Sequence, residues 1–331
     1  MKAILLTRTG DPSVLDYVEV PTPRPGRGEV LVKADTIGVS RPELLVRKGV
    51  YQWMPPLPAI PGIEMAGTVV ERGENATALA LGQKVFVSAR ELTQRAGCYA
   101  EYIAVPESAP FALPPETDLE AAACLSNYQV AYHLIHTATR GVPGRTALIG
   151  SASGGLGSAA VQLAKLAGMM AIAMVGNEAK ARAMQAFGAD HVIDQSRENV
   201  GTRVTAITAG EGVDLILDAV GGNAFARFFA MLAPFGQVVS YGRLQGSPEG
   251  IAAALENGAG YLSSGAFRVF TMHTLDDKPE IRAQSMQYLI ARLSEGAIRP
   301  LIHARLALKD ARLAHEMLEA RNVIGKLLLK P

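Results

Sequence analysis

The sequence predicts an α/β protein built from two domains, a barrel-like β domain and a doubly wound parallel sheet. The chain has 331 residues, which exceeds the usual size of one domain. Short apolar runs separated by Pro and Gly fill residues 1–115, a texture typical of a β-barrel. From residue 146 onward, strand-like and helix-like segments alternate, as in a parallel sheet with crossover helices.

The first part of the chain is expected to supply several strands and then one long helix. Strands are predicted where short apolar runs lie between turn residues, at 29–34, 64–70, 84–87 and 98–105. The hydrophobic period then changes, and residues 118–139 are typical of a helix that begins at Asp118. The first domain boundary is therefore expected within this helix.

The second part is expected to alternate between strand and helix and then to return to the first domain. The predicted strands are 146–149, 171–175, 191–193, 214–218, 236–241 and a last strand near Tyr261. The predicted helices are 158–168, 178–187, 200–209 and 223–232. The tail is predicted to contain helix 278–295, strand 303–306, helix 309–320 and strand 326–329. The expected domains are 1–122 with 270–331, and 123–269.

A glycine-rich turn between strand 146–149 and the next helix is the most informative stretch. It reads Ala152-x-Gly154-x-x-Gly157, the dinucleotide fingerprint with its first glycine replaced by alanine. Gly154 would let the backbone approach phosphates, and Gly157 would let the helix pack close to the strand. The N-terminal amides of the helix would face the anion. The alternative is a tight turn that binds no nucleotide.

Composition favours a small-molecule partner. Lys plus Arg (32) almost balance Asp plus Glu (31), so net charge directs the chain neither to nucleic acid nor to an anionic membrane. Only Cys98 and Cys124 are present, which argues against a disulfide scaffold and fits a reducing compartment. The sequence has no signal-peptide core and no run of roughly 18 apolar residues. We therefore expect a soluble, cytoplasmic protein.

Several motifs in the same order resemble the medium-chain dehydrogenase/reductase superfamily. They are residues 10–15, 61–69, the glycine loop at 151–157, and 311–321. The resemblance covers essentially the whole chain. It implies a GroES-like β-barrel catalytic domain and a Rossmann domain that binds a nicotinamide cofactor.

Two positions indicate the branch of that superfamily. The zinc-dependent alcohol dehydrogenases carry Cys where Ser40 stands and His where Ile63 stands. Neither Ser nor Ile is a zinc ligand, and catalytic zinc usually has three protein ligands. His133 and His136 could share a helix face, but no third ligand accompanies them. We predict no metal, and the remaining resemblance is to zinc-independent quinone oxidoreductases and enoyl-thioester reductases.

Residues 40–53 resemble the segment in which both groups keep their active-site polar residues. Tyr51 is the predicted catalytic residue, because a phenol can donate a hydrogen bond and a proton to an enolate or quinol oxygen. Ser40 is a second candidate, and Gln129 could face the nicotinamide. Quinone reductases usually carry Asn, Tyr and Thr where Ser40, Leu45 and Gln129 stand, which leaves the substrate open. The alternative for Tyr51 is an amphipathic side chain packed at the domain cleft.

NADPH is the expected cofactor. NAD sites usually place Asp or Glu at the end of the second strand, whereas here that strand ends in Gly176 and Asn177. The missing carboxylate leaves room for a 2′-phosphate. By resemblance, Lys180 and Arg321 match basic residues that NADPH-dependent quinone reductases hold near the cofactor.

Two residues count against this assignment. Glu178 places a carboxylate close by, and Gln195 stands where the quinone reductases usually have tyrosine. The complete set of expected cofactor-binding residues is Gln129, Ser151, Ala152, Ser153, Gly154, Gly155, Leu156, Gly157, Gly176, Asn177, Lys180, Gln195, Tyr241, Gly242 and Arg321.

The predicted activity is NADPH-dependent hydride transfer to quinones or α,β-unsaturated carbonyl compounds. One alternative is reduction of trans-2-enoyl thioesters, and another is a crystallin-like protein that binds NADPH without turnover. No cluster of basic and aromatic residues supports nucleic-acid binding. Family members commonly dimerise through the edge of the nucleotide-binding sheet, so we expect a homodimer. Residues 260–267 could be that edge strand or an inner strand.

Overall fold

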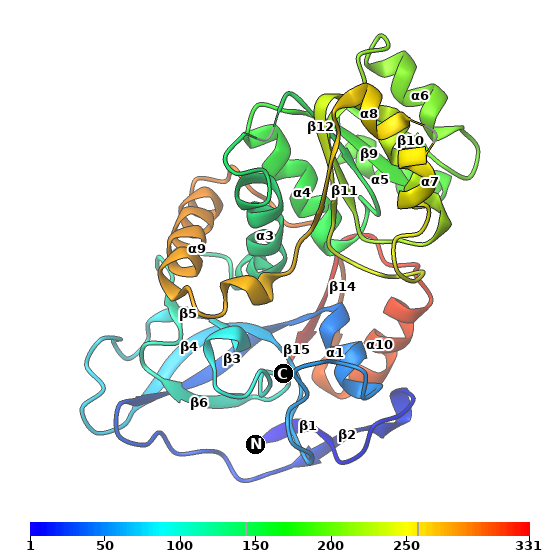
Figure 1. Cartoon of the computed structure of the whole chain (residues 1–331). Coiled ribbons are helices and arrows are strands. Elements are labelled where there is room, and N and C mark those ends of the chain that lie inside the picture. The colour runs from blue at the N-terminus through cyan, green and yellow to red at the C-terminus, as the bar shows by residue number, and fades with distance from the viewer. Residues whose placement is uncertain (143, 257) are drawn as a thin grey trace. The chain divides into compact units, whose positions relative to one another are not determined.

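The computed structural model describes residues 1–142, 144–256 and 258–331, and it confirms the predicted α/β architecture (Figure 1). One compact unit, here called the β unit, comprises Met1–Ser126 and Met286–Pro331. The other, here called the sheet unit, comprises Asn127–Ser285. None of the described helices combines the length and the apolar character that a membrane crossing requires.

The β unit is built around strand β3 (Glu29–Val39), which pairs with three other strands. Its partners are all antiparallel, and they are β4 (Glu64–Arg72), β6 (Tyr102–Pro106) and β15 (Lys326–Lys330). The register between β3 and β4 shifts twice, and such bulges bend a strand so that a sheet can curl. At Gly67 a Cβ atom would lie 2.1 Å from the carbonyl oxygen of Lys33, so this close pairing requires glycine.

The other strands of the β unit extend this sheet or pair beside it. The seven-stranded sheet has the order β14-β15-β3-β4-β5-β7, with β6 on β3. The bounds of these other strands are β1 (Lys2–Leu6), β2 (Leu15–Glu19), β5 (Lys84–Ser88), β7 (Phe111–Ala112) and β14 (Ile302–Ala307). The helical elements of this unit are η1 (Pro12–Val14), α1 (Arg41–Arg47), η2 (Ala89–Glu91), α2 (Leu119–Ala122), η6 (Leu308–Asp310) and α10 (Ala311–Glu319).

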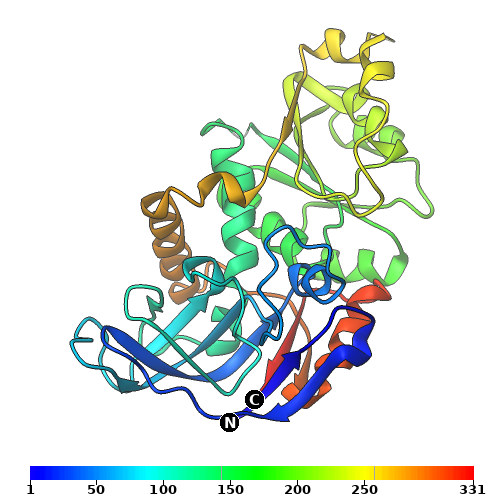
Figure 2. The same cartoon turned by 60° about the horizontal axis from the view of Figure 1, so that its bottom comes forward.

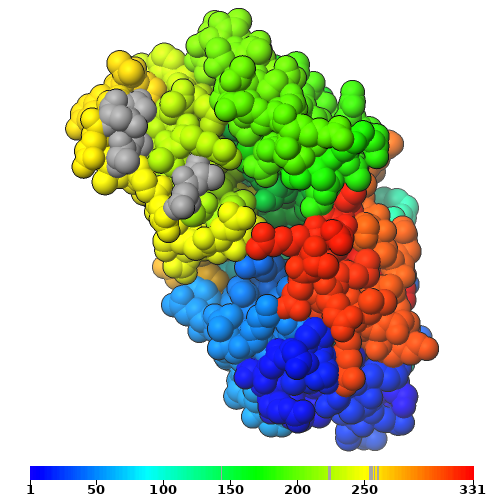
Figure 3. Space-filling model, turned by 90° about the vertical axis from the view of Figure 1, so that its right-hand side faces the viewer, coloured from blue at the N-terminus to red at the C-terminus, as the bar shows by residue number. Residues whose placement is uncertain are grey.

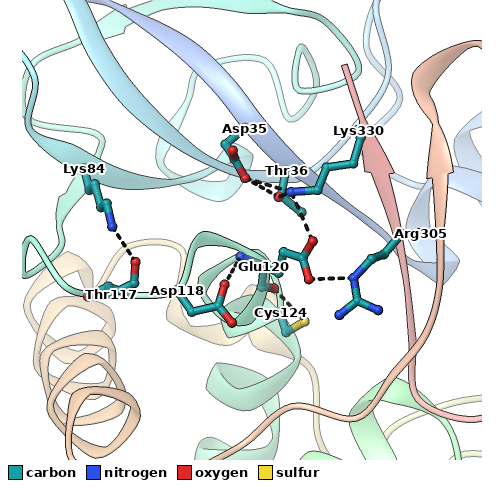
Figure 4. Close-up of polar contacts among 9 residues, drawn as sticks. All are labelled: Asp35, Thr36, Lys84, Thr117, Asp118, Glu120, Cys124, Arg305 and Lys330. Carbon is teal, nitrogen blue, oxygen red and sulfur yellow. Dashed lines mark hydrogen bonds and ion pairs between the residues drawn. The ribbon is translucent and has the colours of Figure 1, made fainter.

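The C-terminal return of the chain is integral to the β unit. Both termini lie in this unit, close to each other in the views of Figures 1 and 2. On the face shown in Figure 3, the orange and red C-terminal segment lies against the dark blue N-terminal segment. Glu120 of α2 pairs with Arg305 of β14 at 2.6 Å and with Lys330 of β15 at 3.2 Å (Figure 4). Lys330 also pairs with Asp35 of β3 at 2.9 Å, so charged side chains join four elements.

The sheet unit is a six-stranded, all-parallel sheet in the order β10-β9-β8-β11-β12-β13 (Figure 1). Numbered from β8, this is the 3-2-1-4-5-6 order of a Rossmann sheet, in which the order reverses between β8 and β11. The strands are β8 (Thr146–Ile149), β9 (Met170–Val175), β10 (His191–Asp194), β11 (Val213–Asp218), β12 (Leu232–Ser240) and β13 (Ala266–Val269).

Helical segments connect these strands. Apolar side chains of the strands and of the helical segments are buried where the two pack together. Leu148, Ile172 and Phe225 belong to this core. The helical elements are α3 (Leu125–Tyr132), η3 (His133–Thr137), α4 (Gly155–Leu166), α5 (Glu178–Ala186), α6 (Val200–Ile207), η4 (Asn223–Met231), α7 (Ile251–Glu256), α8 (Ala259–Ser263), η5 (Met272–Leu275) and α9 (Pro279–Ser294). Helices α3 and α9 cross the boundary between the two units.

The predicted strand near Tyr261 is wrong. Tyr261 lies in the short helix α8, and the last strand, β13, begins only at Ala266. Tyr261 and Leu262 are neighbours that are both exposed, which is not the alternation of a half-buried strand. Ser264 takes a left-handed φ of 49° that ends the helix before β13. The apolar residues around Tyr261 are therefore not explained by membership of the sheet.

Two predicted elements differ in type or continuity. The helix expected at 118–139 is interrupted, because α2 ends before Ala123 and the last part, His133–Thr137, is a π-helix. The helix expected at 223–232 is a 3-10 helix. Strand β6 begins at Tyr102, so Cys98 precedes it, although the thiol is buried in the core of the β unit.

The second unit boundary lies after Ser285, whereas the sequence places the return at residue 270. Hydrogen bonds between α3 and the start of α9 account for this position. Gln129 Nε2 donates to the carbonyl oxygen of Arg282 at 2.9 Å and to Ser285 Oγ at 3.1 Å. Ser285 Oγ also lies 3.0 Å from His133 Nε2. These buried contacts join the first half of α9 to the sheet unit.

Candidate functional site

The glycine loop lies at the carboxyl end of β8, where the strand order reverses. The amide of Gly150 donates to the carbonyl oxygen of Leu217 on β11, and the amide of Ala152 donates to that of Met174 on β9. The loop is thereby fixed over both neighbours of β8. Ser151 has a left-handed φ of 52°, and Gly154 caps the N-terminus of α4 with extended backbone. The result is a rigid turn that presents the amides of a helix start, the arrangement that binds phosphate.

The two fingerprint glycines have different surroundings. A Cβ atom on Gly157 would lie 2.3 Å from the carbonyl oxygen of Ser151 and 2.7 Å from the Cα atom of Ala152, so α4 packs directly on the loop. A Cβ atom on Gly154 would meet only the Ser151 oxygen, at 3.6 Å. Packing within the protein therefore requires glycine at 157 but leaves open space at 154.

The end of β9 combines a helix start with several basic side chains. Asn177 Oδ1 accepts from the amide of Lys180 at 2.9 Å and caps α5. Glu178 pairs with Arg182 at 2.6 Å and with Arg197 at 2.8 Å. The carboxylate that counted against NADPH is thus neutralised by two guanidinium groups. With Lys180, these groups leave this rim of the sheet with an excess of positive charge.

Gln195 and Gly176 lie beside each other at the same rim. The Nε2 atom of Gln195 is 4.0 Å from the position that a Cβ atom on Gly176 would take. Gln195 directly follows β10, and Gly176 directly follows β9. The structure therefore brings together these two residues, which sequence reasoning placed in one site.

Tyr241 and Gly242 follow β12 and lie next to the end of β11. The amide of Tyr241 donates to the carbonyl oxygen of Asp218 at 2.9 Å. A Cβ atom on Gly242 would be 2.5 Å from the carbonyl oxygen of Ala219. The Asp218 carboxylate accepts from the amides of Val220 and Gly221, which fixes this turn. Desolvation by the surrounding protein and the charge of Asp218 raise the pKa of the Tyr241 phenol.

Gln129 and Arg321 belong to other elements than these strand ends, Gln129 to α3 and Arg321 to the segment after α10. Gln129 is 3% exposed, and its amide nitrogen is used in the contacts between α3 and α9 described above. Arg321 belongs to the β unit, where it follows α10 with a left-handed φ of 56°. Burial and the charge of Arg321 lower the pKa of Arg41, which shows that two guanidinium groups of the β unit lie near each other.

Tyr51 stands in an aromatic and cationic cluster of the β unit. Its ring centroid is 5.6 Å from that of Trp53, and the Arg95 guanidinium carbon is 5.5 Å from the Trp53 ring centroid. Burial raises the pKa of the Tyr51 phenol, and the charges of Arg90 and Arg95 oppose this effect, as does a hydrogen bond with Arg95. Sequence reasoning named Tyr51 as a candidate but named neither arginine, because neither belongs to a motif.

Ser40 lies in a buried polar cluster of the β unit. Its hydroxyl donates to Glu64 Oε1 at 3.1 Å and accepts a hydrogen bond from the ammonium group of Lys326. Lys326 also pairs with Glu64, whose other oxygen accepts from the amide of Ser126 at 3.2 Å. Burial acts to lower the pKa of Lys326, but the carboxylates around it raise that pKa above its usual value. A protein cation therefore contacts Ser40, one of the two positions where zinc-dependent relatives carry metal ligands.

Among the described residues, no group of three or more His, Cys, Asp or Glu side chains has a geometry that could hold a metal ion. His133, one of the two histidines considered for this role, contacts Thr137 through Nδ1 and Ser285 through Nε2. Both ring nitrogens of His133 are thus engaged in hydrogen bonds within the protein. Burial lowers the pKa of His136, which favours its neutral form.

A cavity of about 420 Å³ opens in the β unit, and Tyr51 is not one of its lining residues. The lining residues are Gly10, Asp11, Pro12, Arg47, Lys48 and Glu319. Glu319 pairs with Arg47 Nη2 at 2.6 Å and with Lys48 at 2.5 Å, whereas Nε and Nη1 of Arg47 are buried without a hydrogen-bond partner among the described residues. The cavity therefore lies at the ionic contact that joins Arg47 and Lys48 to α10.

Two family models match the chain. One, described as an alcohol dehydrogenase GroES-like domain, matches residues 26–115, and the other, described as a zinc-binding dehydrogenase, matches residues 187–329. The quinone oxidoreductase of Pseudomonas aeruginosa is 32% identical over 335 residues, covering 100% of this chain and 99% of that protein. The rat synaptic vesicle membrane protein VAT-1 homolog is 29% identical over 346 residues, covering 100% of this chain and 84% of that protein.

Solved structures agree with these sequence relatives. The crystal structure of Escherichia coli quinone oxidoreductase complexed with NADPH has a TM-score of 0.86 to this chain at 28% identity, and the match covers 100% of both chains. The expected GroES-like and Rossmann domains are thereby confirmed.

Proposed function

The chain belongs to the quinone oxidoreductase branch of the medium-chain dehydrogenase/reductase superfamily, and we propose that it is a zinc-independent, NADPH-dependent reductase of quinones or α,β-unsaturated carbonyl compounds. The observation that carries this proposal is the phosphate-binding edge of the sheet unit. The glycine loop, Gly176 and the turn at Tyr241 all follow strands whose carboxyl ends meet at one edge. Dinucleotides bind at this edge in Rossmann sheets.

Charge at the end of β9 supports NADPH as the cofactor. The amides of residues 151–157 would hold the pyrophosphate, and Lys180 would face the 2′-phosphate together with Arg197. Glu178, paired with two arginines, would present little net negative charge to this phosphate. Arg321 stays a proposed cofactor-binding residue because segment 311–321 resembles the corresponding segment of NADPH-dependent quinone reductases. When bound, the nicotinamide supplies a hydride.

Metal-free chemistry is supported by the donor set around Ser40. Ser40 and Ile63 provide no zinc ligand, and the Lys326 ammonium group would repel a divalent cation. The family description "zinc-binding dehydrogenase" therefore names a property that these residues do not support. Elemental analysis of dialysed protein is expected to find no stoichiometric zinc, and EDTA should leave the rate unchanged. Loss of activity on EDTA treatment that zinc restores would contradict this part.

Tyr51 is the proposed catalytic residue. Reduction of a quinone or an enone places negative charge on a carbonyl oxygen, which in the absence of a metal needs hydrogen-bond donors. The Tyr51 phenol can donate to that oxygen and pass a proton to it. Ser40 is the second proposed residue, and its contacts with Glu64 and Lys326 fix the start of the segment that leads through α1 to Tyr51.

We also propose a cytoplasmic homodimer. Both cysteines are free and buried, which fits a reducing compartment. Strand β13 is at one end of the sheet order, and it could pair with β13 of a second copy.

The test is oxidation of NADPH with 1,4-benzoquinone, 9,10-phenanthrenequinone, a simple enone and crotonyl thioester. Turnover with the quinones or the enone supports the proposal, and Tyr51→Phe should then lower kcat by about 100-fold. Preference for the crotonyl thioester would favour the enoyl-thioester reductases. Binding of NADPH without oxidation on the whole panel would favour a non-catalytic protein. An unchanged rate in Tyr51→Phe would remove Tyr51 from the mechanism.

A further inference from the structure

A guanidinium group is held against both aromatic residues of the Tyr51 segment. Arg95 lies over Trp53, with its guanidinium carbon 5.5 Å from the ring centroid, a distance at which cation–π attraction is significant. The same side chain forms a hydrogen bond with the Tyr51 phenol. Trp53 and Tyr51 are themselves packed together at 5.6 Å between ring centroids. Arg95 is therefore fixed by one ring while it contacts the other.

The charges that face Tyr51 come from three parts of the β unit. Arg90 lies on η2, Arg95 lies in the loop after η2, and Glu43 lies on α1. Burial favours the neutral phenol, and Glu43 adds to this effect when its carboxyl is ionised, whereas both arginines favour the phenolate. Arg90 contributes charge, and Arg95 contributes both charge and a hydrogen bond. The charge of each arginine lowers the pKa of the Tyr51 phenol, with Arg90 giving the larger charge effect, and Arg95 adds a hydrogen bond.

We propose that Arg95 is a positioning residue that orients the Tyr51 phenol and stabilises the phenolate left when Tyr51 donates its proton. The proposal rests on the proposed function for the identity of the proton acceptor. Reduction of a quinone or enone consumes one hydride and one proton. The O–H bond of Tyr51 breaks, its proton goes to the substrate oxygen, and water returns a proton to the phenolate after each turnover. The guanidinium neither gives nor takes a proton, because it stays charged throughout.

The chain offers a local probe, because Trp53 is its only tryptophan. Ionisation of Tyr51 beside Trp53 is expected to quench the tryptophan fluorescence, so a pH titration of this signal reports on Tyr51 without cofactor or turnover. The Tyr51→Phe variant should lose this fluorescence change, which would show that the change comes from Tyr51 and not from another tyrosine. In Arg95→Met the midpoint should move to higher pH, and Arg95→Lys should restore part of the shift. Arg90→Met is the comparison, because it removes a nearby charge, leaves the hydrogen bond of Arg95 in place and so shows how far charge alone moves the midpoint.

A double-mutant cycle with NADPH and an accepted substrate gives the second measurement. Arg95→Met alone should lower kcat by about 10-fold or more, with KM little changed. In the Tyr51→Phe background the same change should have no further effect, because residues that act through one another are not additive. An unchanged fluorescence midpoint in Arg95→Met, or equal losses of kcat in both backgrounds, would overturn the proposal. If no substrate is turned over while the midpoint shifts, the proposed function fails and the coupling of Arg95 to Tyr51 stands.

Discussion

At the scale of single residues, Glu43 is the buried acid that most directly links stability to pH. It is 1% exposed, and its Oε1 accepts from the amide of Ile63 at 3.3 Å. Its other oxygen is buried without a hydrogen-bond partner in the structure. Burial raises the pKa of this carboxyl to about 8, the charge of Lys326 opposes the rise, and that of Glu64 adds to it. Glu43 is therefore expected to stay protonated in the folded protein at neutral pH.

This raised pKa predicts that the free energy of unfolding falls as pH rises between about 4.5 and about 8. In that range the folded protein keeps the proton that the unfolded chain has released, so a higher pH favours unfolding, by up to about 1.4 kcal/mol per pH unit. Urea unfolding at several pH values should show this slope in the wild type. Glu43→Gln keeps the hydrogen-bond acceptor but cannot ionise, and it should lose the slope. An identical slope in both proteins would show that Glu43 is ionised in the folded state.

The basic residues at the end of β9 predict the cofactor preference. Lys180→Ala is expected to lower kcat/KM for NADPH by about 10-fold, because charged hydrogen bonds to a phosphate are among the strong ones, and to leave NADH unchanged. Arg197→Ala should act in the same direction, because Glu178 then loses one of the two guanidinium groups that pair with it. Arg203→Ala is the control, since Arg203 lies on α6 and pairs with Glu198. Equal losses for both cofactors would remove these residues from 2′-phosphate recognition.

Residue-scale features were predictable where they form part of a local motif. The loop residues 151–157 and Gly176 follow from spacing alone, because a strand, a turn and a helix adjoin in the sequence. The partner of Ser40 could not be found in this way, since Lys326 lies 286 positions away along the chain. Arg95 was missed for a similar reason, because the fold brings an irregular loop to the aromatic pair.

At the scale of elements, the turn from β8 to α4 contains two fingerprint glycines that are needed for different reasons. Gly157 is needed for packing within the protein, and Gly154 is proposed to be needed for binding the cofactor. A methyl group at position 157 would meet backbone atoms at 2.3 and 2.7 Å, so Gly157→Ala should destabilise the fold by about 1–3 kcal/mol. A methyl group at 154 meets only one atom, at 3.6 Å, and the φ of −79° suits alanine. Gly154→Ala should therefore unfold at nearly the wild-type temperature while its affinity for NADPH falls. Thermal unfolding and an NADPH fluorescence titration of both variants measure the difference.

Sequence patterns failed for those elements in which tertiary contacts, and not local sequence, decide between helix, strand and loop. The alternation from β8 to β12 was predictable because buried parallel strands are continuous apolar runs. The run around Tyr261 is equally apolar, yet it forms a helix in which Tyr261 and Leu262 are exposed. Its apolar side chains are therefore not explained by burial within one copy of the chain. The break between α2 and α3 is similar, because the helical period continues across it while the backbone does not.

At the scale of the whole molecule, the two-domain organisation was predictable because the change from turn-rich strands to strand–helix alternation occurs once. The return of the chain was harder to place. Apolar periodicity marks α9 but does not say which unit its first half joins, and buried hydrogen bonds to Gln129 and His133 decide this. Relatives that match the full length then identify the family, although not the substrate.

The edge of the sheet unit carries the last prediction, a homodimer of two 35.0 kDa chains. β13 pairs with β12 on one side, and within the described residues no strand pairs with its other side. Val269 of β13 is 70% exposed, and in the neighbouring helix Tyr261 is 76% and Leu262 is 90% exposed. An unpaired strand edge beside exposed apolar side chains favours pairing with a second copy.

Light scattering coupled to size exclusion should therefore give the mass of two chains for the wild type. Val269→Lys should shift the protein toward one chain, because a charge on an edge strand opposes strand pairing. Leu81→Lys is the matched control, because Leu81 is 59% exposed but lies in the β unit. If the wild type is monomeric, or if both variants dissociate equally, the β13 edge is not the interface. The exposed side chains of Tyr261 and Leu262 would then have to be explained by contact with a molecule other than a second copy of this chain.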